Sequence, residues 1–191
     1  VFKVLVEVLH LEIVAIAVTP HGPDLAALRQ VCRRRPVRAV YCMPTLHNPL
    51  GWVLGLEHRE ELVRIAREHG LILIEDAAYA FLAEHAPPPL AQLAPERTVY
   101  VGGLSKSVAT GLRVGFVAAP LEWVPALERT LMATVWNAPG VMTAIAVGWI
   151  EDGTVVQREA QKRQDARARQ APATEVLAGR ADISHPPSYR R

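Results

Sequence analysis

The amino-acid sequence predicts an α/β fold, with a mostly parallel sheet and helices on both of its faces. Short apolar segments alternate along the chain with segments whose apolar residues recur at helical spacing, and this alternation is typical of βαβ units. The apolar segments are nonpolar at nearly every position, as expected of parallel strands that are covered on both sides. We therefore expect most strands to be joined by helical crossovers.

The first part of the chain contains three predicted strands and two predicted helices. Residues 13–18 are an apolar, β-branched run, which predicts a buried strand. The next segments predict, in order, a helix over 24–35, a strand over 37–43, a helix over 56–69 and a strand over 71–74. The helix over 56–69 is amphipathic, and Gly70 supplies its C-terminal stop.

The rest of the chain is predicted to be richer in helix. Strands are expected over 98–101 and 114–118, and the pattern from residue 121 onward is mostly helical, with a break at Pro139. Residues 154–177 are polar and predict either one long helix or two shorter ones. A further strand is expected to begin near residue 181.

Composition restricts the classes of protein to consider. The 191 residues are 50% hydrophobic and 21% charged, which is ordinary for a globular chain of one domain with part of a second. A net charge of +2 is too small to argue for nucleic acid or an anionic membrane. Two cysteines are too few for a disulfide framework and fit a reducing cytoplasm. No apolar run reaches the roughly 18 residues that span a bilayer.

The two ends suggest that more chain belongs to this protein. The sequence lacks an initiator Met, opens inside an apolar stretch, and stops at Arg191 without a helix cap or a disordered tail. These features favour an internal fragment of a longer protein over a complete small domain. No signal peptide is recognised at the start.

Unusual polar residues follow three successive predicted strands. They lie in the segments 47–51, 75–79 and 102–113. In an open parallel sheet, ligands bind outside the carboxyl ends of the strands. With regular crossovers, one edge of the sheet would bring together Asn48, Asp76, Tyr79, Lys106 and Arg113. An amide, a carboxylate, a phenol, an amine and a guanidinium placed there suit a polar, anionic, aromatic ligand.

These segments resemble, in order and approximate spacing, the motifs of the fold-type-I pyridoxal-phosphate (PLP) enzymes, the aspartate aminotransferase superfamily. His47-Asn48-Pro49-Leu50-Gly51 is similar to the N-P-T-G turn of that family, and Asp76 to Tyr79 is similar to its D-x-x-Y element. Ser105-Lys106 with Arg113 is similar to its S-K…G-x-R element. The resemblance covers about residues 13–150. It implies that the chain is an incomplete large domain of a PLP-dependent transferase.

Within this superfamily, the sequence is most similar to the MocR-like branch. The residues that carry this similarity are 103–107, 111–115 and 136–139. Members of the branch join a winged-helix DNA-binding domain to an aminotransferase-like domain. The resemblance thus implies that DNA would be contacted only through a domain outside these residues.

The resemblance implies catalytic roles for three residues. Lys106 would be the Schiff-base lysine and would later act as acid and base at the α-carbon of the substrate. Asp76 would accept a hydrogen bond from the pyridine nitrogen, because a fixed carboxylate favours the protonated ring. Tyr79 would hydrogen-bond the phenolic oxygen of the ring.

Three more residues are implied in binding the cofactor. Asn48 would join Tyr79 at the phenolic oxygen. Arg113 would bind the phosphate through its planar guanidinium, and Ser105 would add a hydroxyl. No residue is assigned as a metal ligand.

The sequence departs from the family pattern in several places. Gly103 stands where Ser or Thr is common, so one phosphate hydroxyl is missing, and Leu50 replaces the Thr of the turn. The glycine-rich phosphate turn and the aromatic residue that stacks on the ring would lie upstream of Val1. The arginine that binds the substrate carboxylate would lie beyond Arg191. The chain alone is therefore expected to lack full activity.

Each assigned residue also has a simpler interpretation. Lys106 and Arg113 could be surface residues, Tyr79 an ordinary half-buried tyrosine, and Asp76 the N-cap of a short helix. Asn48 could be only a turn residue before a proline. The basic run over 158–169 could attract nucleic acid, although mixed charges on a helix usually form a solvated face.

The sequence therefore predicts transfer of an amino group between an amino acid and a 2-oxo acid, with PLP as cofactor, by a cytoplasmic homodimer. Residues 1–180 would be the partial large domain and 181–191 the truncated start of the C-terminal small domain. One alternative is a MocR-like regulator that senses PLP. Another keeps the fold but is a lyase or decarboxylase.

Overall fold

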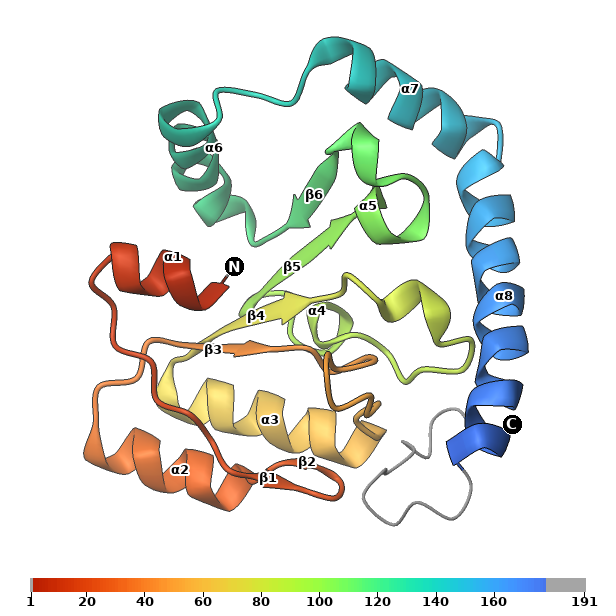
Figure 1. Cartoon of the computed structure of the whole chain (residues 1–191). Coiled ribbons are helices and arrows are strands. Elements are labelled where there is room, and N and C mark those ends of the chain that lie inside the picture. Colours follow the sequence, from red (N-terminus) through yellow and green to blue (C-terminus); the bar gives the residue numbers. More distant parts are fainter. Residues whose placement is uncertain (1, 178–191) are drawn as a thin grey trace. The chain divides into compact units, whose positions relative to one another are not determined.

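The computed structural model describes residues 2–177, which form two compact units divided between Val37 and Arg38. The first unit contains α1 (Phe2–Val8), β1 (Val18–Thr19), β2 (Gly22–Pro23) and α2 (Leu25–Arg34). The sheet and the helices around it make up the second unit (Figure 1). In chain order its elements are β3 (Ala39–Cys42), α3 (Leu56–His69), β4 (Ile72–Asp76), η1 (Ala80–Leu82), α4 (Leu90–Leu93), β5 (Thr98–Gly103), α5 (Leu104–Ser107), η2 (Thr110–Leu112), β6 (Gly115–Ala118), η3 (Leu121–Trp123), α6 (Val124–Thr134), α7 (Gly140–Glu151) and α8 (Thr154–Leu177).

In the first unit, the prediction of a buried strand over 13–18 is wrong. Residues 11–17 have no regular structure, and the short strand β1 pairs antiparallel with β2 instead. Ile13 and Val14 are 48% and 38% exposed. The run has the composition of a strand, but among the described residues no neighbouring strand pairs with residues 11–17. A buried strand needs such a neighbour, because its backbone N–H and C=O groups must be paired. The helix α2 is confirmed, because Asp24 caps it by accepting from the backbone N–H of Ala26 and Ala27.

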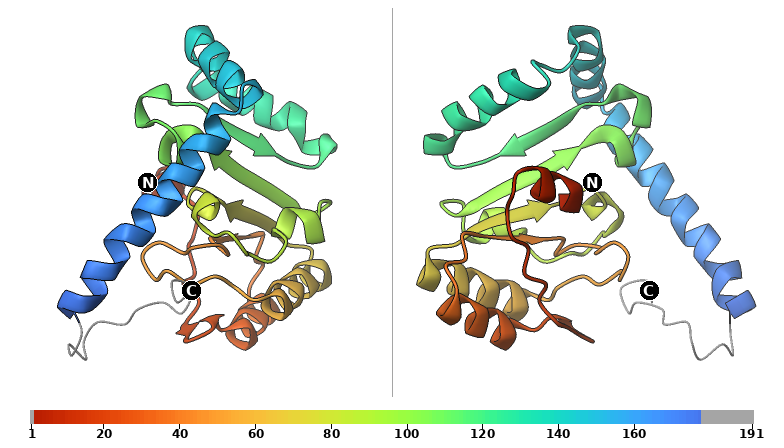
Figure 2. Two further views of the ribbon diagram at one scale, coloured as in Figure 1. Left: turned by 90° about the vertical axis from the view of Figure 1, so that its right-hand side faces the viewer. Right: turned by 60° about the vertical axis from the view of Figure 1, so that its left-hand side comes forward.

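The second unit is built on a four-stranded sheet in the order β3-β4-β5-β6. The first three strands are parallel, and β6 pairs antiparallel with β5 (Figure 2). The predicted parallel-rich α/β fold is therefore confirmed. The direction of β6 follows from its short connection, because a parallel neighbour needs a crossover of a dozen or more residues.

The helix α3 forms as the sequence predicts, with the same bounds. Its apolar face is buried at Leu62, Ile65 and Ala66. Gly70 ends the helix with φ 66°, a left-handed conformation that glycine adopts without a steric penalty. The helix thus begins and ends where local chemistry requires.

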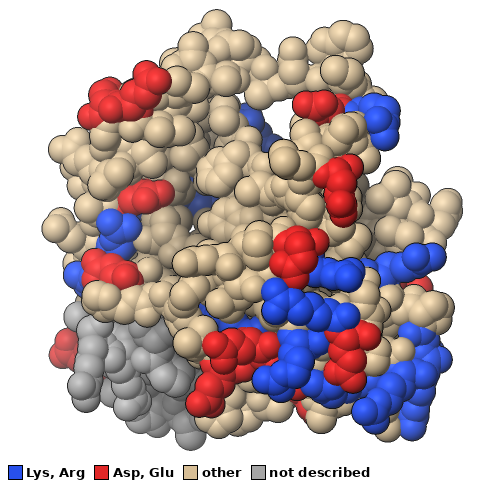
Figure 3. Space-filling view, turned by 180° about the vertical axis from the view of Figure 1, so that it is seen from behind, with Lys and Arg blue, Asp and Glu red and all other residues tan. Residues whose placement is uncertain are grey.

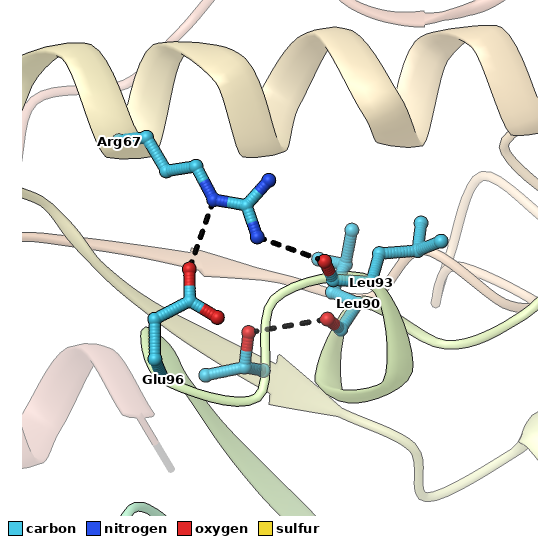
Figure 4. Close-up of polar contacts among 5 residues, drawn as sticks. Arg67, Leu90, Leu93 and Glu96 are labelled. Carbon is cyan, nitrogen blue, oxygen red and sulfur yellow. Dashed lines mark hydrogen bonds and ion pairs between the residues drawn. The ribbon is translucent and has the colours of Figure 1, made fainter.

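Polar contacts join α3 to the end of α4 and to the segment that leads into β5. Arg67 Nε donates to Glu96 Oε1 at 2.9 Å, and its guanidinium also donates to the carbonyl of Leu93 at 3.0 Å (Figure 4). The hydroxyl of Thr98 donates to the carbonyl of Leu90 at 3.3 Å. These bonds fix the start of β5 against the helical layer.

The two faces of the sheet differ in solvent exposure at β4. Leu73 and Glu75 of β4 are 0% and 1% exposed and lie on the face that α4 packs against, whereas Ile74 and Asp76 on the opposite face are half-buried. On that second face, Val117 of β6 is 49% exposed. The difference between the faces disappears at β6, because Phe116 on the first face is 51% exposed.

The predicted helical C-terminal part is confirmed, and residues 154–177 form a single helix, α8. The helix α7 packs through Ala146 against Leu104 and Leu112, next to the ends of α5 and η2. None of the helices in residues 2–177 has the length and apolar character needed to cross a membrane. Acidic and basic side chains are interspersed on the face drawn in Figure 3, so that face is not a field of one sign. The expected boundary at residue 180 and the strand near 181 lie outside the described residues.

Truncating the buried face of α3 should destabilise the protein. Ile65→Ala leaves a cavity at a fully buried position and should lower the free energy of unfolding by about 2–5 kcal/mol. Urea unfolding followed by circular dichroism measures this change. Glu60→Ala, at an exposed position of the same helix, is the matched control and should change it by no more than about 0.5 kcal/mol. Equal effects of the two substitutions would contradict the packing described.

Candidate active site

The topology brings the predicted site residues to one edge of the sheet. Asn48 follows β3, Asp76 is the last residue of β4, and Ser105 and Lys106 lie in α5 directly after β5. Because these strands are parallel neighbours, their carboxyl ends meet at this edge. Arg113 precedes the antiparallel strand β6, whose first residue pairs with the last residue of β5. It therefore reaches the same edge from the opposite direction.

The lysine, the tyrosine and the aspartate form the centre of this edge. The Nζ atom of Lys106 lies 5.8 Å from the centroid of the Tyr79 ring, over its face. Asp76 accepts a hydrogen bond through Oδ1 from the backbone N–H of Ala78 at 2.9 Å. This bond stays within the turn, and the short helix η1 begins only after Tyr79. Asp76 therefore does not serve as the N-cap of that helix.

A residue that the sequence analysis did not single out bonds directly to Asp76. The phenolic Oη of Tyr41, in β3, donates to Asp76 Oδ2 at 2.6 Å. Tyr41 pairs with Ile74 in the ladder, so it lies on the same face of the sheet as Asp76, two residues further along β4. The signal was present in the sequence as a tyrosine inside an otherwise apolar strand. Only the register between the strands reveals its partner.

Asn48, Ser105 and Arg113 are positioned at the edge without contacting the central three residues directly. Asn48 is exposed, in a turn where His47 Nδ1 accepts from the backbone N–H of Leu50 at 3.3 Å. Ser105 is half-buried, and its carbonyl accepts from the hydroxyl of Thr110 at 3.2 Å.

Arg113 is held in an unusual backbone conformation. Its φ is 53°, a left-handed value that costs a non-glycine residue free energy, and such residues tend to occur at functional sites. Its side chain is exposed and forms no ion pair with any carboxylate in residues 2–177. The simpler interpretation of Arg113 as a surface ion-pair partner therefore finds no partner in the part of the chain described.

An added side chain would be crowded at both glycines before Lys106. A Cβ on Gly102 would lie 2.4 Å from the ring of Phe116, and one on Gly103 would lie 3.2 Å from the carbonyl oxygen of Val114. The second contact is to backbone, so a side chain at Gly103 would require β6 to shift by a few tenths of an ångström.

The helix α8 binds both loops that carry the central residues. Lys162 Nζ donates to the carbonyl of Lys106 at 2.8 Å, and the guanidinium of Arg163 donates to the carbonyl of Phe81 at 2.8 Å. Arg167 forms an ion pair with Glu84. Three basic residues of the run over 158–169 are thus engaged within the chain, which argues against a surface for nucleic acid there.

A buried arginine, Arg59, fixes the backbone that leads into the turn of Asn48. Arg59, in α3, is 0% exposed and donates to the carbonyls of Leu54 at 2.9 Å, Pro44 at 3.0 Å and Pro88 at 3.2 Å. It also donates to the hydroxyl of Thr45 at 2.8 Å. Pro44 and Thr45 lead from β3 into the turn of Asn48, so this guanidinium fixes the approach to that turn.

The environment of Arg59 contains two further ionisable groups. Burial raises the pKa of the Glu75 carboxyl, while the backbone N–H groups of Ala91 and Leu90 and the charge of Arg59 lower it. Burial also raises the pKa of the Cys42 thiol to about 12, and the charge of Glu75 acts in the same direction. Cys42 is therefore a protonated, structural thiol.

Comparison with known proteins shows the family. The family model for aminotransferase class I and II matches residues 2–188. The chain belongs to this family.

Among relatives, the chain is 30% identical over 129 residues to the uncharacterized HTH-type transcriptional regulator YdeF of Bacillus subtilis. The aligned region covers 68% of this chain and 28% of that protein. The chain is also 37% identical over 118 residues to the 2-aminoadipate transaminase of Thermus thermophilus. The aligned region covers 59% of this chain and 29% of that protein. The chain thus spans under a third of the length of these two relatives.

A solved structure agrees with this assignment. The chain superposes on LysN, the α-aminoadipate aminotransferase of Thermus thermophilus complexed with N-(5′-phosphopyridoxyl)-L-leucine, with a TM-score of 0.82 and 26% identity. The superposition covers 92% of this chain and 47% of that one. The architecture described above is therefore that of a fold-type-I aminotransferase.

Removing the guanidinium of Arg59 should destabilise the protein strongly. Arg59→Met keeps the apolar stem but leaves several buried acceptors without a donor, each at a cost of about 1–3 kcal/mol. We expect the free energy of unfolding to fall by at least about 3 kcal/mol in urea titrations. Arg64→Met, at an exposed position of the same helix, is the control. Similar losses for both variants would contradict the role given to Arg59.

The two cysteines should differ in reactivity. At pH 8 the Cys42 thiol stays protonated because its pKa is about 12, and only thiolates alkylate. Iodoacetamide should therefore label Cys32 at least about tenfold faster than Cys42 in the folded protein. Mass spectrometry of tryptic peptides measures both rates. In urea the two rates should converge, whereas rapid labelling of folded Cys42 would contradict the raised pKa of its thiol.

Proposed function

We propose that this chain is part of a PLP-dependent enzyme that transfers an amino group between an amino acid and a 2-oxo acid. The observation that carries the proposal is the placement of Lys106 over Tyr79 at the carboxyl edge of the sheet, where Asp76 ends the neighbouring strand. Membership of the aminotransferase family and the likeness to the LysN complex support it.

The donor set at this edge suits PLP. The primary amine of Lys106 is accessible for covalent attachment to the cofactor aldehyde, and Asp76 offers a carboxylate to the ring nitrogen. Tyr79 and Asn48 offer hydrogen bonds to the phenolic oxygen, and Ser105 and Arg113 offer a hydroxyl and a guanidinium to the phosphate. These roles are our assignments for the six residues.

The chain's own residues would then divide the chemistry between them. When bound, PLP supplies an electron sink for the charge that develops at the α-carbon of the substrate. Asp76 holds a proton on the ring nitrogen by hydrogen bonding and charge. Lys106 Nζ moves a proton at the α-carbon, and Tyr79 keeps that amine close through the face of its ring.

A second candidate function comes from the relatives. Several proteins similar to this chain are named HTH-type transcriptional regulators, among them YdeF and YisV of Bacillus subtilis. A regulator would use the same PLP site to sense an amino acid and would contact DNA through another domain. It would form little or no 2-oxo acid. Product analysis separates all the alternatives, since a lyase would release ammonia and a decarboxylase carbon dioxide.

Three further expectations belong to this proposal. We infer a homodimer, a cytoplasmic location, and a division near residue 180 between the PLP-binding large domain and a C-terminal small domain. Sedimentation of the full-length protein would test the first.

Borohydride trapping tests the proposed function. These 191 residues contain three lysines, Lys3, Lys106 and Lys162, and each lies in a different tryptic peptide, so peptide mass spectrometry distinguishes them. After incubation with PLP and reduction, mass spectrometry should find the pyridoxyl group on Lys106 of the full-length protein, because that amine lies over the ring of Tyr79 at the carboxyl edge of the sheet. Lys162 and Lys3 should remain unmodified and serve as internal controls.

Two outcomes would contradict the assignment. Modification that persists after Lys106→Ala would mean that another group captures the cofactor. Absence of any adduct on the full-length protein would remove PLP from the proposal and leave the fold alone.

A further inference from the structure

The hydrogen bond between Tyr41 and Asp76 links a second strand to the proposed cofactor site. Tyr41 lies in β3 and Asp76 ends β4, so the bond joins two neighbouring parallel strands on one face of the sheet. The Oη to Oδ2 distance of 2.6 Å is in the range of short, charge-assisted O–H···O⁻ bonds. None of the three family-like motifs contains Tyr41.

Both oxygens of the Asp76 carboxylate are held by donors from separate parts of the chain. Oδ2 accepts from Tyr41, and Oδ1 accepts from the backbone N–H of Ala78 at 2.9 Å. An ionised carboxylate has about four acceptor positions, so about two remain. Two fixed donors define the plane of the carboxylate and leave the remaining lone pairs for a third donor.

Tyr41 acts as the donor in this bond throughout the neutral pH range. Burial raises the pKa of Tyr41 well above its ordinary value, and the hydrogen bond to Asp76 and the negative charge of Asp76 raise it further. The phenol therefore keeps its proton, and the direction of the hydrogen bond is fixed.

We propose that Tyr41 is a positioning residue that aims the carboxylate of Asp76 at the ring nitrogen of PLP. The inference rests on the proposed function and adds to it a residue outside the recognised motifs. Tyr41 touches neither cofactor nor substrate, and it acts by fixing the orientation of Asp76. The strength of the contact between Asp76 and the ring nitrogen then depends on Tyr41.

This role differs measurably from that of a tyrosine that only stabilises the fold. If Tyr41 acts through Asp76, its removal matters only when the ligand has a ring nitrogen for Asp76 to meet. A purely structural tyrosine would affect any ligand of the site equally. The discriminating ligand is an analogue of PLP in which a C–H group replaces the ring nitrogen.

The experiment measures dissociation constants of PLP and of this analogue for the full-length protein. Tyr41→Phe should weaken PLP about tenfold, the effect of losing one hydrogen bond to a charged group, and should change the analogue less than about twofold. Tyr100→Phe is the matched control. Tyr100 is half-buried in β5, pairs with Glu75 and so lies on the other face, where its ring stacks on Phe116.

The possible results separate the two proposals. Equal weakening of both ligands, or no change in either, would overturn the role of Tyr41 while leaving PLP binding intact. Failure of the unsubstituted protein to form the Lys106 adduct would instead overturn the proposed function, and the inference with it. If Tyr41→Phe does not fold, Tyr41→Met, which also lacks a donor, gives the same comparison, with thermal melting of the unliganded protein as the check on folding.

Discussion

The buried guanidinium of Arg59 is the interaction on which the site depends most. Its hydrogen bonds reach the carbonyls of Pro44 and Leu54, near the two ends of the connection between β3 and α3, and of Pro88, in the connection between η1 and α4. A buried charge is tolerated only where its donors are satisfied, so these connections cannot move independently of α3. The carboxyl edge of the sheet is formed by such connections, and their rigidity allows irregular backbone to hold polar groups in place.

Local chemistry explains which parts of the fold could be predicted from the sequence. The bounds of α3 were readable because an amphipathic period ends at Gly70, and both signals act within the segment itself. The strand expected over 13–18 failed because an apolar run does not specify a ladder partner. The direction of β6 likewise depends on its pairing with β5, which is a property of two segments together.

The same distinction applies to the site. The placement of Asp76 and Lys106 at strand ends followed from topology, and the structure agrees. Tyr41 was missed because its partner is 35 residues away and is specified only by register. Gly103 was interpreted as a missing hydroxyl, and the structure adds that a Cβ there would lie 3.2 Å from the carbonyl oxygen of Val114. What required the structure was in each case a contact between elements.

The bonds from α8 have a mechanical consequence. Lys162 and Arg163 are consecutive residues, and each donates a hydrogen bond to the main chain of a different segment. Lys162 bonds to the carbonyl of Lys106, and Arg163 bonds to the carbonyl of Phe81, two residues after Tyr79. A displacement of this helix as a rigid rod would carry both loops in the same direction. The separation between amine and phenol ring would then be conserved during such a motion, while their common position relative to Asp76, anchored in the sheet, would change.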